Sequence, residues 1–175
     1  MNPKTLVVGL GNLVHRDDGV GVHAIVALRG DRRIPSEVGL LDGGTQGLGL
    51  LHHLSGIRRL LVIDAIDAGE PAGTLLHFEG KALRGLPGKA SVHQLGFSDL
   101  MIALQLLDDS PEEVIVLGIQ PGSTEWGVEL SPPVASALPA LVGLVLRYID
   151  RWEKTRQCES QSPSDHLVSG SKTRC

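Results

Sequence analysis

Aromatic residues and cysteines are scarce in this sequence. Among 175 residues there are two Trp, one Tyr, two Phe and two Cys. A chain of this length suits one domain of ordinary size, and because 42% of its residues are hydrophobic, its core must be built from aliphatic side chains. Cys158 and Cys175 form neither a CxxC pair nor a framework of pairs. The sequence therefore indicates neither a disulfide scaffold nor a cysteine-based zinc site.

Positive charge and long apolar runs are also lacking. The formal net charge is −4, which argues against nucleic-acid binding because phosphate contacts need clustered positive charge. No segment approaches the roughly 20 consecutive apolar residues that span a bilayer. Met1–Lys4 leads straight into a short apolar run and resembles no signal peptide. We therefore expect a cytoplasmic protein that binds neither nucleic acid nor membrane.

Short apolar strands alternate with helices along the chain. Strands are predicted at 6–8, 38–41, 60–63, 74–78 and 114–117, and helices at 20–28, 48–54, 97–107 and 132–152. This alternation is typical of an α/β sandwich, whose apolar strands are buried on both faces. From about Lys154 the composition becomes polar. We therefore divide the chain into a folded domain, residues 1–153, and a tail, residues 154–175, that we predict to be disordered.

Three carboxylates follow the first three predicted strands. Asp18 lies in the loop after the first strand, Asp42 ends the second and Asp64 ends the third. Ligands of open α/β sheets bind outside the carboxyl ends of the strands, so the three side chains share one edge if these strands are parallel neighbours. Taken singly, Asp18 is explained as a helix cap and Asp42 as the start of a turn. Their convergence favours a cation site or a proton-transfer site.

His93 lies between a Gly/Pro-rich loop and a predicted helix. A single histidine at a helix start is more often a hydrogen-bonded surface residue. Beside Asp18 and Asp64, however, it completes a mixed oxygen and nitrogen site that suits nickel, zinc or manganese. Three protein ligands also leave coordination positions for water or substrate, as catalytic metal sites require.

Two other kinds of site find little support. The run Gly9–Asn12 suggests a dinucleotide-binding loop, but Val14 stands where the fingerprint needs its third glycine. No serine lies in a Gly-x-Ser-x-Gly elbow, and neither cysteine lies in the predicted domain. A hydrolase with a covalent nucleophile is therefore not indicated.

Five short motifs resemble those of the [NiFe]-hydrogenase maturation endopeptidases. In chain order they lie within 9–21, 42–45, 62–74, 93–97 and 118–132, the last comprising Gly118-Ile119-Gln120-Pro121 and Leu130-Ser131-Pro132. The resemblance extends from about Leu6 to Trp152 and keeps the order of the family, which makes it far more specific than any single motif.

The resemblance implies a three-layer α/β/α fold, phosphorylase/hydrolase-like, with a mostly parallel five-stranded sheet. It also implies an endopeptidase that removes the C-terminal extension of the hydrogenase large-subunit precursor after nickel insertion. The family's metal ligands correspond here to Asp18, Asp64 and His93, and the choice of Asp18 over Asp17 rests on this match alone. The Asp of the second motif, Asp42, is implied to shape the cleavage site.

Our hypothesis is that the nickel belongs to the substrate and that no cofactor is permanently bound. The metal docks at the three ligands and polarises the scissile carbonyl or the attacking water, and Asp42 acts as general base. Two alternatives remain at this point. The same ligands would serve a non-catalytic, nickel-dependent chaperone of the large subunit, and a nucleotide-binding α/β domain is the third possibility.

Overall fold

The computed structural model of the chain describes residues 4–80 and 92–161, and for 92–96 and 157–161 it describes the backbone only. The elements in chain order are β1 (Thr5–Leu10), η1 (Arg16–Gly19), α1 (Val20–Arg29), β2 (Val38–Gly44), η2 (Gly47–Leu50), α2 (Leu51–Leu54), β3 (Arg59–Ala65), β4 (Leu75–Glu79), α3 (Val92–Leu106), β5 (Glu113–Ile119) and α4 (Pro132–Gln161). Every predicted strand and helix is therefore present, and apart from the end of α4 the predicted ends lie within a few residues of the observed ones.

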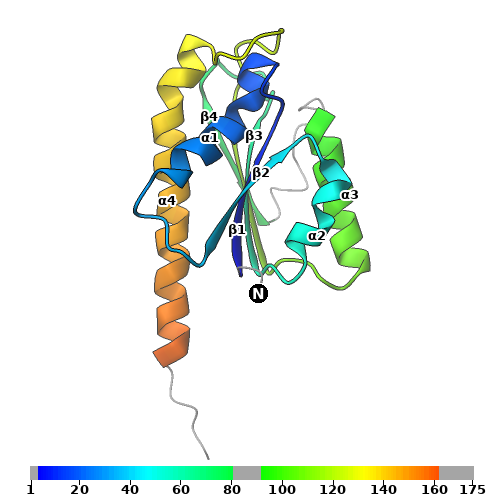
Figure 1. Ribbon diagram of the computed structural model, residues 1–175, viewed down its shortest axis with the longest axis vertical. Coiled ribbons are helices and arrows are strands. Elements are labelled where there is room, and N and C mark those ends of the chain that lie inside the picture. Colours follow the sequence, from blue (N-terminus) through cyan, green and yellow to red (C-terminus); the bar gives the residue numbers. More distant parts are fainter. Residues whose placement is uncertain (1–3, 81–91, 162–175) are drawn as a thin grey trace, which may run out of the picture.

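The strands form one sheet in the order β2-β1-β3-β5-β4. The pairs β1·β2, β1·β3 and β3·β5 are parallel, and β4 alone runs antiparallel, at the outer side of β5. The four parallel strands therefore end at the same side of the sheet, the upper side in Figure 1. We call this side the carboxyl edge and the opposite side the amino edge.

Helices cover both faces of the sheet (Figure 1). On one face, Val7, Leu61 and Leu117 pack in a buried cluster with residues of α1 and α4. On the other face, Leu6 and Val62 pack in a second cluster with residues of α2 and α3. Successive strand residues point to opposite faces, so a strand covered on both sides must be apolar throughout. The predicted three-layer fold is confirmed.

The structure differs from the prediction at the ends of two helices. α3 begins at Val92, before the predicted start at residue 97. α4 continues to Gln161, so the predicted disorder is wrong for residues 154–161, and residues 162–175 lie outside the described part. Lys154 pairs with Asp150 at 2.7 Å, and Arg156 pairs with Glu37 at 2.6 Å. Polar residues thus prolong α4 through surface contacts, which composition alone does not reveal.

Residues 132–156 of α4 are apolar enough, by length and composition, to cross a membrane. From the sequence we expected no segment of this length and composition. In the fold one side of this helix packs onto the sheet, through the buried residues Val134, Leu141, Val145, Ile149 and Trp152. This packing accounts for the apolar residues on that side of α4, and 22% of the apolar window is buried.

Candidate active site

Glycines bring the first and third strands and the start of α1 together at the carboxyl edge. A Cβ on Gly21 would lie 2.3 Å from the carbonyl oxygen of Leu10 and 2.4 Å from that of Ile63. Only glycine permits this approach, because real Cβ atoms do not come so near to backbone oxygens. The start of α1 therefore lies directly on the ends of β1 and β3. The helix η1, which contains Asp18, contacts β3, the strand that contains Asp64.

Asp18 and Asp17 are neighbours in η1 with different surroundings. Asp18 is half-buried, and its Oδ2 accepts a hydrogen bond from the backbone N–H of Asn12 at 3.0 Å. Gly11 makes this loop possible, because its φ is 127° and a Cβ there would lie 1.8 Å from the carbonyl oxygen of Asp18. Asp18 is therefore held at the surface of the carboxyl edge by its own loop.

Asp17 is fully buried and binds the loop that precedes α4. Its Oδ2 accepts hydrogen bonds from the backbone N–H groups of Gly122 and Ser123, at 2.8 and 2.9 Å, and from the Ser131 hydroxyl at 2.7 Å. Its Oδ1 accepts one from the Ser131 N–H at 2.6 Å. Burial raises the pKa of Asp17, but these hydrogen bonds outweigh it and leave the pKa below its ordinary value. Asp17 thus holds the loop before α4, whereas Asp18 is only half-buried, and the assignment of Asp18 as a ligand stays a prediction.

Asp64 lies in the last part of β3 and is almost completely buried. Its Oδ1 accepts a hydrogen bond from the N–H of Ala65 at 2.8 Å. A carboxylate at this depth keeps its charge only where hydrogen bonds or a cation compensate for lost hydration. Asp64 thus lies on the strand that η1 contacts, and its role as a metal ligand stays a prediction.

His93 lies in the first turn of α3, but its side chain lies outside the described part of the chain. Where side chains are described, over 4–80 and 97–156, no three His, Cys, Asp or Glu residues form a group that could hold a metal ion. Asp42 therefore does not complete a three-carboxylate site with Asp18 and Asp64. The predicted three-ligand site depends on His93, and its assignment stays a prediction.

Asp42 is exposed near the end of β2, and its Oδ1 accepts a hydrogen bond from the N–H of Gly44 at 3.1 Å. In the sheet it lies opposite Gly9 of β1, which in turn lies opposite Ile63 of β3. Two strand spacings, about 10 Å, thus separate the Asp42 backbone from that of Ile63. Asp42 shares the carboxyl edge with the predicted ligands but lies to one side of them.

Gln120 is a buried residue of this edge that residue-by-residue sequence reasoning did not single out. Its Oε1 accepts hydrogen bonds from the N–H groups of Ala68 and Glu70, at 2.8 and 3.2 Å, and its Nε2 donates to Asp67 at 3.0 Å. It therefore fixes the loop that follows Asp64. The signal in the sequence was a polar residue directly after the apolar run of β5.

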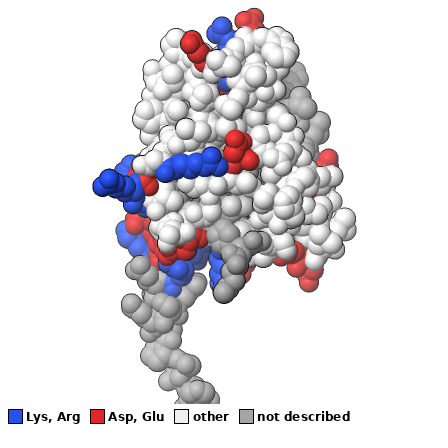
Figure 2. Space-filling view, viewed as in Figure 1, with Lys and Arg blue, Asp and Glu red and all other residues white. Residues whose placement is uncertain are grey.

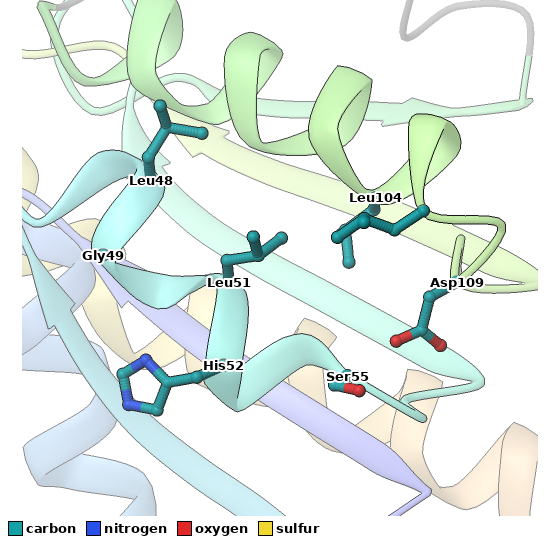
Figure 3. A pocket seen from close by; sticks show the side chains of 8 residues that line it. Leu48, Gly49, Leu51, His52, Ser55, Leu104 and Asp109 are labelled. Atoms are coloured by element: carbon teal, nitrogen blue, oxygen red, sulfur yellow. The ribbon is translucent and has the colours of Figure 1, made fainter.

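The pocket in Figure 3 lies elsewhere, between α2 and the C-terminal part of α3. It has a volume of about 440 Å³, and its lining includes Leu51, Leu104 and Leu107. Asp109 lines it too, and accepts hydrogen bonds from the Gly56 N–H at 3.1 and 3.2 Å. None of the predicted site residues in the described part lines this pocket.

The fold and the carboxylates define a class of protein, an α/β enzyme whose polar site lies outside the carboxyl ends of parallel strands. Comparisons with known proteins narrow that class. The family model described as hydrogenase maturation protease (HycI) matches residues 22–148. The chain belongs to the hydrogenase maturation protease family, and it is accordingly a hydrolase.

Individual relatives agree with this assignment. The hydrogenase expression/formation protein HupD of Rhizobium leguminosarum bv. viciae is 37% identical over 153 residues, 86% of this chain and 76% of HupD. The hydrogenase 2 maturation protease of Escherichia coli K12 is 34% identical over 141 residues, 79% of this chain and 86% of that protein. The solved structure of the hydrogenase maturating endopeptidase HybD from E. coli superimposes with a TM-score of 0.80 at 31% identity, over 86% of this chain and 93% of HybD. The predicted family and fold are confirmed.

Proposed function

We propose that this protein is a metal-dependent endopeptidase that removes the C-terminal extension of a [NiFe]-hydrogenase large-subunit precursor and recognises the nickel that the precursor carries. The observation that supports it most is the placement of Asp18, in η1, against β3, the strand near whose end Asp64 lies at the same edge of the sheet. Each carboxylate accepts a hydrogen bond from a backbone N–H, from Asn12 and Ala65 respectively. Such bonds fix the orientation of a metal ligand.

His93 supplies the nitrogen ligand in this proposal. Two carboxylates and one imidazole suit a borderline divalent ion such as nickel. Because the metal arrives with the substrate, the protein needs no permanently bound cofactor. The N–H groups of Asn12 and Ala65 hold the carboxylates in place before the precursor arrives, so little ordering is needed on docking.

The chemical step is hydrolysis of one peptide bond. The docked nickel polarises the scissile carbonyl or the attacking water. The Asp42 backbone lies about 10 Å from the backbone of Ile63. In this proposal the exposed Asp42 carboxylate accepts the proton of the water as general base. The proton then passes to the leaving amine, so that the products are the mature carboxyl terminus and the released extension. The cytoplasm is the proposed location of this reaction.

The test is a cleavage assay with purified precursor, nickel-loaded and nickel-free, read by mass spectrometry. We expect a shortened product from the loaded precursor only, and no product with Asp64→Asn or His93→Ala. Asp108→Asn is the matched control, since Asp108 is exposed after α3 at the amino edge, and it should cleave normally. Equal cleavage of the nickel-free precursor would refute recognition of nickel. A stable complex without cleavage would instead identify a chaperone.

A further inference from the structure

Apolar side chains are exposed beside the predicted site. Trp126 is 76% exposed and Val128 is 64% exposed, and across from them Leu13 and Val14 are 42% and 43% exposed. None of these four residues belongs to either core cluster. We call this surface the Trp126 rim. Exposing a tryptophan to water is unfavourable, so a rim of this kind points to a binding role.

The Trp126 rim is held rigidly. The N–H of Arg16 donates to the carbonyl of Gly127 at 2.8 Å, and the N–H of Gly127 donates to the carbonyl of Val14 at 3.0 Å. The Trp126 ring lies against the ring of His15, with centroids 4.5 Å apart. An exposed but preorganised aromatic side chain loses little conformational entropy on binding, which is typical of energetically dominant residues in interfaces.

The rim and the predicted metal ligand are parts of one rigid body. Asp17 binds Gly122, Ser123 and Ser131, which flank Trp126 on both sides in the sequence. Asp18 is the next residue. A partner that places a metal at Asp18 therefore meets the Trp126 rim at a fixed distance, so the rim is continuous with the proposed site.

Charge narrows the kind of partner. Glu125 and Glu129 are exposed on either side of Trp126 and Val128. Arg16 is half-buried, with its Nε packed against Gly127. The exposed carboxylates favour a partner with basic groups beside its apolar side chains.

We propose that the Trp126 rim is the docking surface for the precursor segment next to the cleaved bond, a segment with apolar side chains flanked by at least one basic residue. This inference rests on the proposed function. The rim contributes ground-state binding, whereas the edge carboxylates act on the bond itself. Loss of the rim should therefore raise KM and leave kcat nearly unchanged.

The first experiment compares Trp126→Ala, Trp126→Phe and Leu106→Ala in steady-state cleavage of nickel-loaded precursor. Leu106 is the control because it is 83% exposed on α3, away from the rim. We expect Trp126→Ala to raise KM at least about tenfold with kcat within about twofold, and Trp126→Phe to stay within about threefold. Leu106→Ala should match the wild type. An unchanged KM in a folded Trp126→Ala protein overturns the proposal.

The second experiment reads docking without turnover. The two tryptophans, Trp126 and the buried Trp152, are labelled with 5-fluorotryptophan in Asp42→Asn protein, which keeps the predicted ligands. Adding nickel-loaded precursor should shift the Trp126 fluorine resonance and leave the Trp152 shift unchanged. A complex that leaves the Trp126 resonance in place overturns the proposal.

The same two experiments separate the possible failures. A concentration-dependent Trp126 shift without precursor, together with a change in sedimentation in Trp126→Ala, identifies a second copy of the chain as the occupant and overturns the proposal. If the wild type does not cleave but the Trp126 resonance shifts on docking, the proposed protease function fails and the docking surface stands.

Discussion

The carboxylates at the two edges of the sheet have different hydrogen-bond partners. At the amino edge, two glutamates pair with arginines: Arg58 contacts Glu112 at 2.6 Å, and Arg151 pairs with Glu113. The hydrogen bond from Arg58 is the main cause of the lowered pKa of Glu112. Lysines, arginines and acidic residues accordingly lie side by side at the lower end of the molecule in Figure 2.

At the carboxyl edge, the hydrogen bonds described for the carboxylates come from N–H groups and one hydroxyl. They reach Asp17 from the Gly122, Ser123 and Ser131 segment, Asp18 from Asn12 and Asp64 from Ala65. A backbone N–H stabilises a carboxylate without cancelling its charge, whereas an arginine cancels it. The two glutamates at the amino edge are thus held by charged side chains, whereas Asp17 at the carboxyl edge is held by backbone N–H groups and one hydroxyl.

The largest effect should come from removing a charge at the carboxyl edge. Asp64→Asn keeps an oxygen for the Ala65 N–H but loses the negative charge. We expect cleavage of loaded precursor to fall about a thousandfold, the equivalent of about 4 kcal/mol in the transition state. Single-turnover kinetics measure it. Wild-type rates in this variant would show that the charge of Asp64 is not needed.

The second difference between the edges is how closely the backbone packs, and the two ends of α1 show it. Gly21→Ala at its start would bring a Cβ into the Leu10 and Ile63 carbonyls, so we expect a loss of more than about 3 kcal/mol in unfolding free energy. Gly30→Ala at its other end meets only the carbonyl of Ala27, at 3.7 Å. Urea unfolding should show a near-neutral Gly30→Ala. Equal effects at the two glycines would contradict the tight carboxyl edge.

Asp17→Asn tests the structural carboxylate. An amide cannot accept all four hydrogen bonds, so we expect a loss of about 2–3 kcal/mol in unfolding free energy at pH 7. The readout is urea denaturation, with Asp108→Asn as the exposed control. A variant as stable as the wild type would mean that the loop before α4 is held by other contacts.

For the same variant, Asp17→Asn, we expect the loss of stability to depend on pH. The pKa of Asp17 is lower in the fold than its ordinary value of 3.8, so the unfolded chain binds the proton more readily. Its stabilising contribution is complete above pH 3.8 and is lost as the pH falls through the lowered pKa. The stability difference between wild type and Asp17→Asn should therefore shrink below that pH. A difference that grows on acidification would reverse this sign.

The smallest effect is expected at the amino edge. Glu112→Gln removes an exposed partner of Arg58, and solvent-exposed ion pairs contribute little. We expect the urea midpoint and the cleavage rate to match the wild type within error. A clear loss of activity would place part of the site at the wrong edge of the sheet.

The strands could be predicted from the sequence because buried strands need unbroken apolar runs. Asp18, Asp42 and Asp64 could likewise be predicted to lie at one edge, since parallel strands end together. The sequence did not show that α4 continues to Gln161, because ion pairs such as Arg156 with Glu37 join residues far apart in the chain. Nor did it reveal Gln120 as the residue that fixes the loop after Asp64.

Asp17 and Asp18 show what the sequence determines by itself and what depends on the tertiary structure. The sequence by itself determined that an acidic pair follows the first strand and that the chain resembles one family of endopeptidases. Only the tertiary structure decided that Asp17 is buried and bonded to Gly122, Ser123 and Ser131, and that Asp18 is half-buried and bonded to its own loop. The physical reason is that a carboxylate's role depends on the donors around it, and here those donors come from more than 100 residues away along the chain.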